Sequence, residues 1–210
     1  MYISNNKSLN SFILQKKRYK NNSILPHIEI NLKDIIFDHK VQTYCNNPGF
    51  KCPNYDHSWA CPPEAPYLEK EVSQYSRFFL IYYQFELDPY VREVQSKHPR
   101  RRREKIINAL FWDSIVRDYL EREIIEFIDN LKDNYQEIRI LWDGFCRVCF
   151  NKKDKGCTYD SGKPCRYPKK IRYSMEASGI DVNATAKNAN IKLEWPPSKD
   201  VYRFGLVCLK

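Results

Sequence analysis

The sequence has no apolar run long enough to cross a membrane. A helical span needs roughly 18 consecutive apolar residues, and the longest apolar stretch here, FFLIYYQF from Phe78 to Phe85, is far shorter. A short, continuous run of this kind predicts a single strand that is buried on both faces. We therefore expect no membrane partner for this chain.

Glycine is also scarce, with 6 residues in a chain of 210. None of them forms a Gly-x-Gly-x-x-Gly pattern or a phosphate loop, so the usual flavin and nucleotide motifs are excluded. If the protein carries electrons, we expect a redox partner protein to supply them rather than NADH.

Acidic residues are missing before Glu29, although this part of the chain holds five lysines and arginines. It also lacks the apolar core of a secretory signal peptide. We expect residues 1–24 to be a flexible leader, with an organellar transit peptide as the alternative, and residues 25–210 to form a single cysteine-rich metal-binding domain. The expected location is the cytoplasm, where clustered cysteines are metal ligands or redox groups more often than disulfides.

Positive charge is concentrated in one run. The formal net charge is +9, and KHPRRRREK, from Lys97 to Lys105, holds six cations and one acid. The four consecutive arginines could bind the phosphates of a nucleic acid or another acidic partner. The alternative is a solvated loop that leads into a helix. These arginines are Arg100, Arg101, Arg102 and Arg103.

Three elements in the middle of the chain predict a β-α-β unit. Arg77–Leu87 and Glu137–Asp143 have the composition of strands, and apolar residues between them recur at helical spacing over about 28 residues. Strands connected in this way are normally parallel, with a right-handed crossover. Two further strands are expected at 191–195 and 202–209. We predict an α/β fold with a small mixed sheet and two cysteine-rich metal-binding loops.

Four of the eight cysteines follow the second predicted strand, with the spacing Cys146-x2-Cys149-x7-Cys157-x7-Cys165. Four thiolates can hold one tetrahedral zinc ion or the four irons of a [4Fe–4S] cluster. The segment has few apolar residues to bury, so a metal centre is needed to order it. Zinc sites favour two Cys-x2–4-Cys pairs, whereas the last two cysteines here stand singly. We therefore favour a [4Fe–4S] cluster, with Zn²⁺ as the alternative.

Three more cysteines lie in a second turn-rich segment, as Cys45-x6-Cys52-x8-Cys61. Three thiolates can hold a cluster and leave one iron open, which is typical of a catalytic centre. Alternatively, His57 or Cys208 supplies a fourth ligand. For His57 a surface position is favoured over ligation, and Cys208, in the apolar run GLVCL, is more readily explained as a small buried hydrophobe. One or two clusters are therefore expected.

Several stretches of the sequence resemble a known family. They cover roughly Cys45 to the C-terminus, and the most specific are the Cys-Pro-Pro at 61–63, the Cys-Arg-Tyr-Pro at 165–168 and RYSMEASGIDV from Arg172. The family is an uncharacterised prokaryotic one of predicted metal-binding proteins, a domain of unknown function. Tyr173 departs from the proline that usually follows the arginine. The resemblance implies metal or iron–sulfur binding by the cysteines and no established substrate.

Two arginines near the last cysteine are candidate cofactor-binding residues. Arg166 and Arg172 would place positive charge beside a thiolate-ligated cluster, whose net charge is negative, and would raise its reduction potential or hold an anion. The alternative is an ordinary ion pair with Glu176 or Asp181.

Three functions follow from these patterns. The favoured one is a cytosolic iron–sulfur protein with a role in electron transfer. The second is a structural-zinc module that uses the basic run to bind RNA or another acidic partner. The third is a sulfur-transfer enzyme that uses an open iron at Cys45, Cys52 and Cys61.

Overall fold

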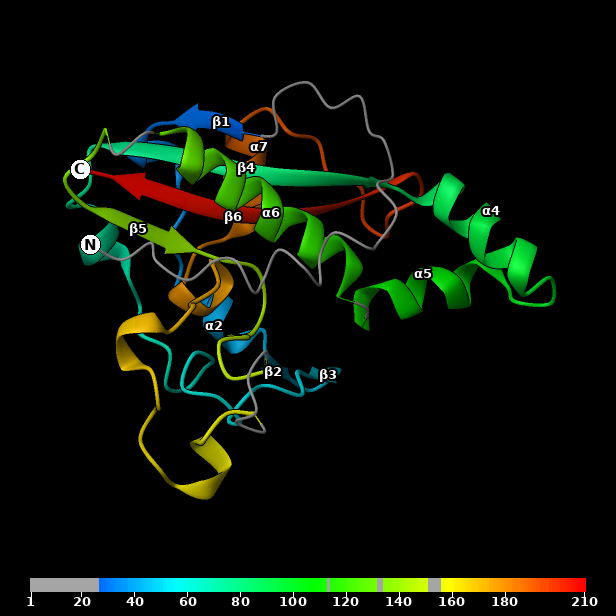
Figure 1. The fold of residues 1–210 in the computed structure, drawn as a ribbon, viewed down its shortest axis with the longest axis horizontal. Coiled ribbons are helices and arrows are strands. Elements are labelled where there is room, and N and C mark those ends of the chain that lie inside the picture. Colours follow the sequence, from blue (N-terminus) through cyan, green and yellow to red (C-terminus); the bar gives the residue numbers. More distant parts are fainter. Residues whose placement is uncertain (1–26, 113, 132–133, 151–155) are drawn as a thin grey trace.

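A four-stranded sheet forms the centre of the protein (Figure 1). The computed structural model describes residues 27–112, 114–131, 134–150 and 156–210, so the expected leader at 1–24 lies outside the described residues. The sheet order is β1-β4-β6-β5, and each neighbouring pair is antiparallel. Its strands are β1 (His27–Ile30), β4 (Arg77–Glu86), β5 (Ile138–Leu141) and β6 (Asp200–Leu209). Two short strands, β2 (Asn46–Asn47) and β3 (Phe50–Lys51), pair separately.

Strand β4 is buried on both faces, as its apolar composition predicts. Phe78 and Leu80 face one apolar cluster, together with Met175 and Ile180 from the C-terminal half of the chain. The intervening residues face the opposite cluster, which is built on α6 (Ile115–Asn130). Side chains alternate between the faces of a strand, so this single strand contributes to two cores. These alternate residues are Phe79, Ile81, Tyr83 and Phe85.

The prediction of a mixed sheet with a parallel pair of strands is wrong. Strands β4 and β5 do run in the same direction, because both pair antiparallel with β6. However, β6 lies between them, so they form no parallel pair and the sheet is antiparallel throughout. The C-terminal strand is the longest and most apolar partner available, and it buries more surface beside β4 than the four-residue β5 would.

The single long helix predicted after the basic run is two helices. These are α5 (Arg103–Trp112) and α6 (Ile115–Asn130). Only α6 lies on the sheet, whereas α5 turns back along α4 (Leu87–Lys97) (Figure 1). Helix α4 was not predicted, because Asp88-Pro89 indicated only the end of a strand. Proline is well tolerated in the first turn of a helix, and here it stands in that turn.

The other face of the sheet is covered by short helical elements. Helix α7 (Val182–Asn188) begins at Asp181, whose carboxylate accepts a hydrogen bond from the Ala184 amide at 2.9 Å. The strand predicted at 191–195 is not formed, although Ile191 and Leu193 pack against the core. The remaining short helices are η1 (Leu32–Asp34), α2 (Lys40–Thr43), α3 (Glu69–Val72), η2 (Tyr159–Ser161), η3 (Pro168–Lys170) and η4 (Glu176–Ser178).

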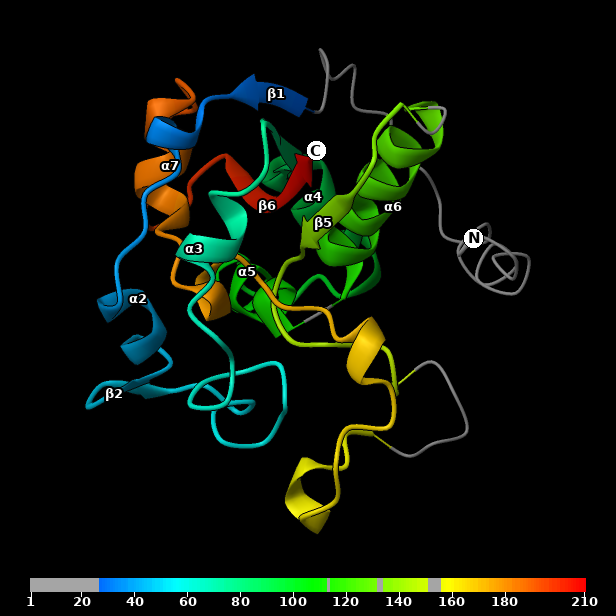
Figure 2. The ribbon, with the colours of Figure 1, turned by 90° about the vertical axis from the view of Figure 1, so that its left-hand side faces the viewer.

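The two cysteine-rich segments lie side by side at one edge of the sheet. Figure 1 and Figure 2 both place the 45–61 segment next to the 156–165 segment, away from the sheet strands. Segments that are about 100 residues apart in the chain are thus brought together. Among the helices described, none has the length and apolar character needed to cross a bilayer.

Candidate metal centre

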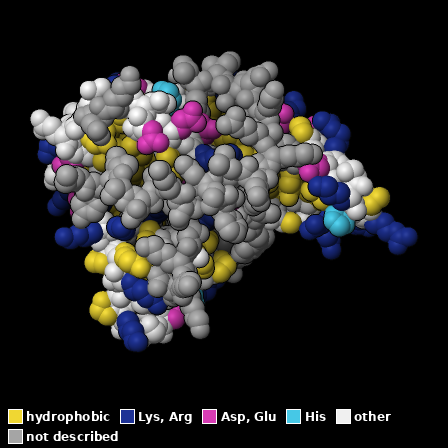
Figure 3. Space-filling view, in the orientation of Figure 1, with side chains coloured by type: hydrophobic (Ala, Val, Ile, Leu, Met, Phe, Trp, Pro, Cys, Tyr) yellow, Lys and Arg dark blue, Asp and Glu magenta, His cyan; other side chains and the backbone are white. Residues whose placement is uncertain are grey.

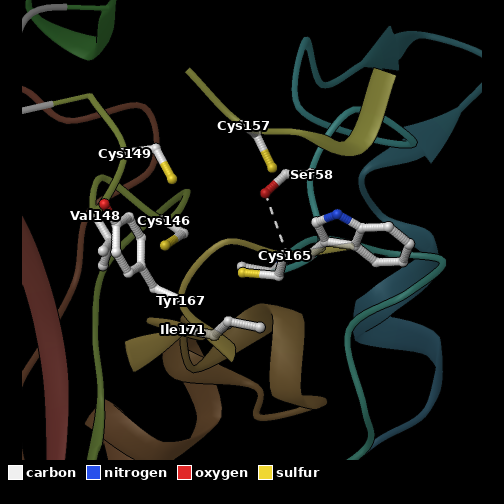
Figure 4. A pocket seen from close by; sticks show the side chains of 10 residues that line it. Ser58, Cys146, Val148, Cys149, Cys157, Cys165, Tyr167 and Ile171 are labelled. Carbon is white, nitrogen blue, oxygen red and sulfur yellow. Dashed lines mark hydrogen bonds between the residues drawn. The ribbon is translucent and has the colours of Figure 1, made fainter. Parts of the chain in front are cut away.

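Four cysteine thiols of the 146–165 segment surround one small cavity. Cys146, Cys149, Cys157 and Cys165 all line it, and Figure 4 shows their sulfur atoms directed toward a common space. Cys149 is buried, and the other three are half-buried. Burial raises the pKa of Cys165, and so do the nearby thiolates of Cys149, Cys157 and Cys146. The structure therefore brings together all four cysteines of this predicted ligand set.

The backbone of this segment reverses direction at glycines. Gly144 follows β5 with a φ of 63°, and Gly156 and Gly162 have φ values of 91° and 65°. Only glycine adopts this left-handed region without strain, so each position favours the residue it has. The buried Thr158 hydroxyl closes the loop by donating to the Pro164 carbonyl at 2.9 Å. Cys157 and Cys165 are thereby held on two sides of one compact turn.

The first cysteine segment supplies part of the wall of the same cavity. Ser58, Trp59 and Ala60, just before Cys61, line it together with the four thiols. The Trp59 indole donates to the Lys163 carbonyl at 3.2 Å, and its ring packs edge-on against Tyr159 at 4.9 Å. The two segments consequently form a single unit, which we call the cysteine module (residues 45–61, 144–150 and 156–166).

Polar contacts also join the two halves of the cysteine module at its surface. The Tyr159 hydroxyl donates to Asp56 Oδ1 at 2.7 Å, and this bond is the main reason why the pKa of Tyr159 rises to about 12. His57 Nδ1 lies 2.8 Å from Asp160 Oδ1. His57 is exposed in this pair, as expected for a surface histidine, and it contacts a carboxylate rather than a cysteine.

In the first segment, the pKa values of Cys45 and Cys61 are both raised. Burial, followed by the charges of Cys52 and Glu176, raises the pKa of Cys45 to about 11. Burial raises the pKa of Cys61 to about 12, with smaller contributions from Cys52, Cys45 and Cys146. Charges act on a pKa in this way only over short distances. Because the charge of Cys146 acts on the pKa of Cys61, the three-cysteine group lies beside the four-cysteine group.

The donor set suits soft metals, although no compact single-ion site is formed. Thiolates are the preferred ligands of zinc and of iron–sulfur clusters. Within the described residues, however, no group of three or more Cys, His, Asp or Glu side chains is arranged so that it could hold a metal ion. The thiols thus surround a shared space without converging on one point.

Cys208 is excluded from the cysteine module by the fold. It lies in β6, is fully buried and belongs to the apolar cluster on one face of the sheet. Burial raises the pKa of its thiol to about 12, as expected for a group in apolar surroundings. The interpretation of Cys208 as a small buried hydrophobe is confirmed.

The two candidate arginines have different surroundings. Arg166 is exposed and donates to the Gly156 carbonyl, so it closes the turn that carries Cys157 and Cys165. Arg172 lies over the Trp142 ring, with its guanidinium carbon 4.0 Å from the ring centroid, and donates to Glu121 at 3.0 Å. The expected ion-pair partners of Arg172, Glu176 and Asp181, are therefore wrong.

A group of ion pairs behind the second cysteine segment was not predicted. Asp143, just after β5, is paired with Arg117 of α6 at 3.2 Å and with Arg203 of β6 at 3.4 Å. The Asp143 side chain is only 6% exposed. The position of Asp143, a carboxylate directly after an apolar strand, was the sequence signal that could have indicated this group of ion pairs. Near it, burial and the charge of Asp143 raise the pKa of Glu176.

One of three comparisons with known proteins yields a match. A search of curated proteins and a search of solved structures both yield no match. A family model described as "Predicted metal-binding protein (DUF2284)" matches residues 28–209, which is nearly the whole chain and includes both cysteine segments. The chain therefore belongs to this family of predicted metal-binding proteins.

Proposed function

We propose that the protein is an iron–sulfur protein that binds a [4Fe–4S] cluster at Cys146, Cys149, Cys157 and Cys165 and takes part in electron transfer. The observation that carries this proposal is the convergence of these four thiols on one cavity. A bound cluster of this kind accepts and donates single electrons. The protein contributes the thiolates, the buried wall and the ion pairs that hold the segment in place.

The spacing of the four cysteines along the sequence favours a cluster over a single zinc ion. Zinc–sulfur bonds of about 2.3 Å in a tetrahedron bring the sulfurs to within about 3.8 Å of one another. In a cube each thiolate binds a different iron, so the sulfurs stand farther apart. Four cysteines that line one cavity, the last two of which stand singly in the sequence, fit the four separate irons of a cluster better than the paired cysteines of a zinc site.

A second centre at Cys45, Cys52 and Cys61 extends the proposal. The Cys52 amide donates to the Cys45 carbonyl at 2.8 Å, and the charge of Cys52 contributes to the raised pKa values of Cys45 and Cys61, which supports a grouping of these three thiols. His57 is paired with Asp160, and Cys208 lies in the core, so neither is positioned as a fourth ligand. A cluster held by three cysteines would keep one iron open to a non-protein ligand. This arrangement would suit the sulfur-transfer alternative, whose substrate remains to be identified.

Anaerobic purification followed by metal analysis tests both centres. We expect brown protein that absorbs near 400 nm, with about four irons and four sulfides per cluster and an EPR signal after reduction. Cys165→Ser should remove the irons of the first centre, and Cys52→Ser those of the second. Cys208→Ala is the matched control and should keep the full iron content. Colourless protein with stoichiometric zinc would contradict the proposal and favour the zinc module.

Electron transfer requires a separate measurement, because a cluster can also be structural. We expect the reduced protein to be reoxidised by a soluble electron acceptor in step with the loss of its EPR signal. If the reduced cluster forms but exchanges no electrons with any acceptor or donor protein, the redox role is wrong even though the cluster is present.

A further inference from the structure

The basic run lies at the tip of a helical hairpin that projects from the rest of the protein. Helix α4 ends at Lys97 and α5 begins at Arg103, so the run forms the turn between them. Figure 1 shows this hairpin extending beyond one end of the sheet, and Figure 3 shows Lys, Arg and His side chains gathered on it. Much of the +9 charge of the chain is therefore presented on one convex protrusion.

Only part of this charge is used within the fold. Arg103 is paired with Asp88 at 2.7 Å and donates to the Ser198 carbonyl at 2.8 Å. Lys97 is paired with Glu93 at 2.8 Å. The three intervening arginines are exposed, and no ion pair joins them to a carboxylate in the part of the chain that the structure describes. Arg100, Arg101 and Arg102 are therefore available for an external anion.

Two of these arginines, Arg100 and Arg101, border an open hollow in the surface. Lys97, His98, Pro99, Arg100 and Arg101 line it, so nearly all of its walls are cationic or titratable. Guanidinium groups match the geometry of phosphate oxygens and are weakly hydrated, which favours phosphate binding over other anions. The hollow thus has the chemistry of a phosphate-binding surface.

A large exposed aromatic ring accompanies the charge. Trp195 is 84% exposed and lies in the 191–199 loop, whose Ser198 carbonyl accepts the hydrogen bond from Arg103, the first residue of α5. Aromatic side chains beside a basic surface are the usual arrangement for single-stranded nucleic acids, because every base can stack on them.

We propose that the α4–α5 hairpin binds single-stranded nucleic acid, with Arg100, Arg101 and Arg102 on the phosphates and Trp195 stacked on a base. In Figure 1 the hairpin projects from the right-hand end of the sheet, whereas the cysteine module lies below the sheet. An electron-transfer partner must approach the cluster closely, so this surface is poorly placed for redox docking. The site is independent of the metal that the cysteine module binds.

Fluorescence anisotropy with a labelled oligothymidine 20-mer, repeated with oligouridine, tests the proposal over a range of salt concentrations. Each phosphate contact contributes about 0.7 to the slope of log affinity against log salt for single strands. Replacing Arg100, Arg101 and Arg102 by Gln should therefore reduce the slope by about 2 and weaken binding at least tenfold at low salt. Trp195→Ala should weaken binding about tenfold with little change in the slope.

A charge-matched variant provides the control. Lys33, Lys70 and Lys187 are exposed elsewhere on the surface, and replacing them by Gln removes the same charge. An equal loss of binding in the two triple variants would show a non-specific charge effect and overturn the proposal. Equally tight binding of poly-glutamate would indicate an acidic protein partner instead. Equally tight binding of duplex DNA, with no effect of Trp195→Ala, would overturn the single-stranded assignment.

Discussion

Glu121 of α6 accepts a hydrogen bond at 2.9 Å from Arg147, which lies between Cys146 and Cys149. The other oxygen of the same carboxylate accepts from Arg172 at 3.0 Å. One half-buried acid therefore connects the sheet-covering helix to both ends of the second cysteine segment. This connection positions the thiols without contacting them.

Removing this acid should destabilise the protein. Glu121→Ala removes the shared partner of two arginines that are only 16% and 24% exposed, and Arg147 keeps its second pair, with Asp118 at 2.6 Å. Breaking such a buried pair costs about 3 kcal/mol, and partial exposure reduces this to about 2 kcal/mol. Urea denaturation measures the change. Glu126→Ala, an exposed position on the same helix, is the control and should change stability by less than about 0.5 kcal/mol. Equal effects of the two substitutions would refute the connecting role of Glu121.

Two glycines have nearly the same backbone conformation, but replacing them by alanine should cost different amounts of folding stability. Gly144 and Gly162 have φ values of 63° and 65°. A Cβ atom on Gly144 would lie 1.9 Å from Arg117 Nη2, whereas one on Gly162 meets open space. Gly162→Ala should therefore cost about 1 kcal/mol from backbone strain alone. Gly144→Ala should cost at least 1 kcal/mol more, because it displaces Arg117 from Asp143. Thermal unfolding of both variants compares these costs directly.

The buried Cys208 thiol should make the fold sensitive to alkali. Its pKa is raised from 9.0 to about 12 by burial, so the unfolded chain ionises first. The resulting stability is fully present below pH 9 and is lost as the pH rises toward 12, by at most about 1.4 kcal/mol per pH unit. Urea unfolding at several pH values should show a shallower decline for Cys208→Ala than for the wild type. Parallel declines would show that another group is responsible.

His57 and Trp59 both contact the second cysteine segment, but they should differ in their effect on stability and on retention of the proposed cluster. The His57–Asp160 pair is exposed, so His57→Ala should change stability by less than about 1 kcal/mol and leave the iron content unchanged. Trp59 lines the cavity and donates a hydrogen bond to the opposite segment, so Trp59→Ala should let an iron chelator remove the proposed cluster several-fold faster. Chelation followed near 400 nm measures this. Loss of iron from His57→Ala alone would reassign that side chain as a ligand.

Local patterns were sufficient to predict some of the structure. The run from Phe78 to Phe85 predicted a strand buried on both faces, and the cysteine spacing predicted a four-thiol group. Both depend on neighbouring residues in the chain, whose periodicity and clustering are visible in one sequence. The break near Ser114 and helix α4 were missed, because they depend on packing between α4 and α5 beyond the sheet.

The amino-acid sequence by itself determined which residues can serve as metal ligands and which strand lies at the centre, because thiol chemistry and apolar content belong to individual residues. Only the tertiary structure decided that β6 separates β4 from β5. It likewise decided that Trp59 lines a cavity whose four cysteines lie about 100 residues farther along the chain. It also decided that Glu121 holds Arg147 and Arg172. These are contacts between distant segments, whose pairing is selected by the total burial and charge compensation of the folded chain.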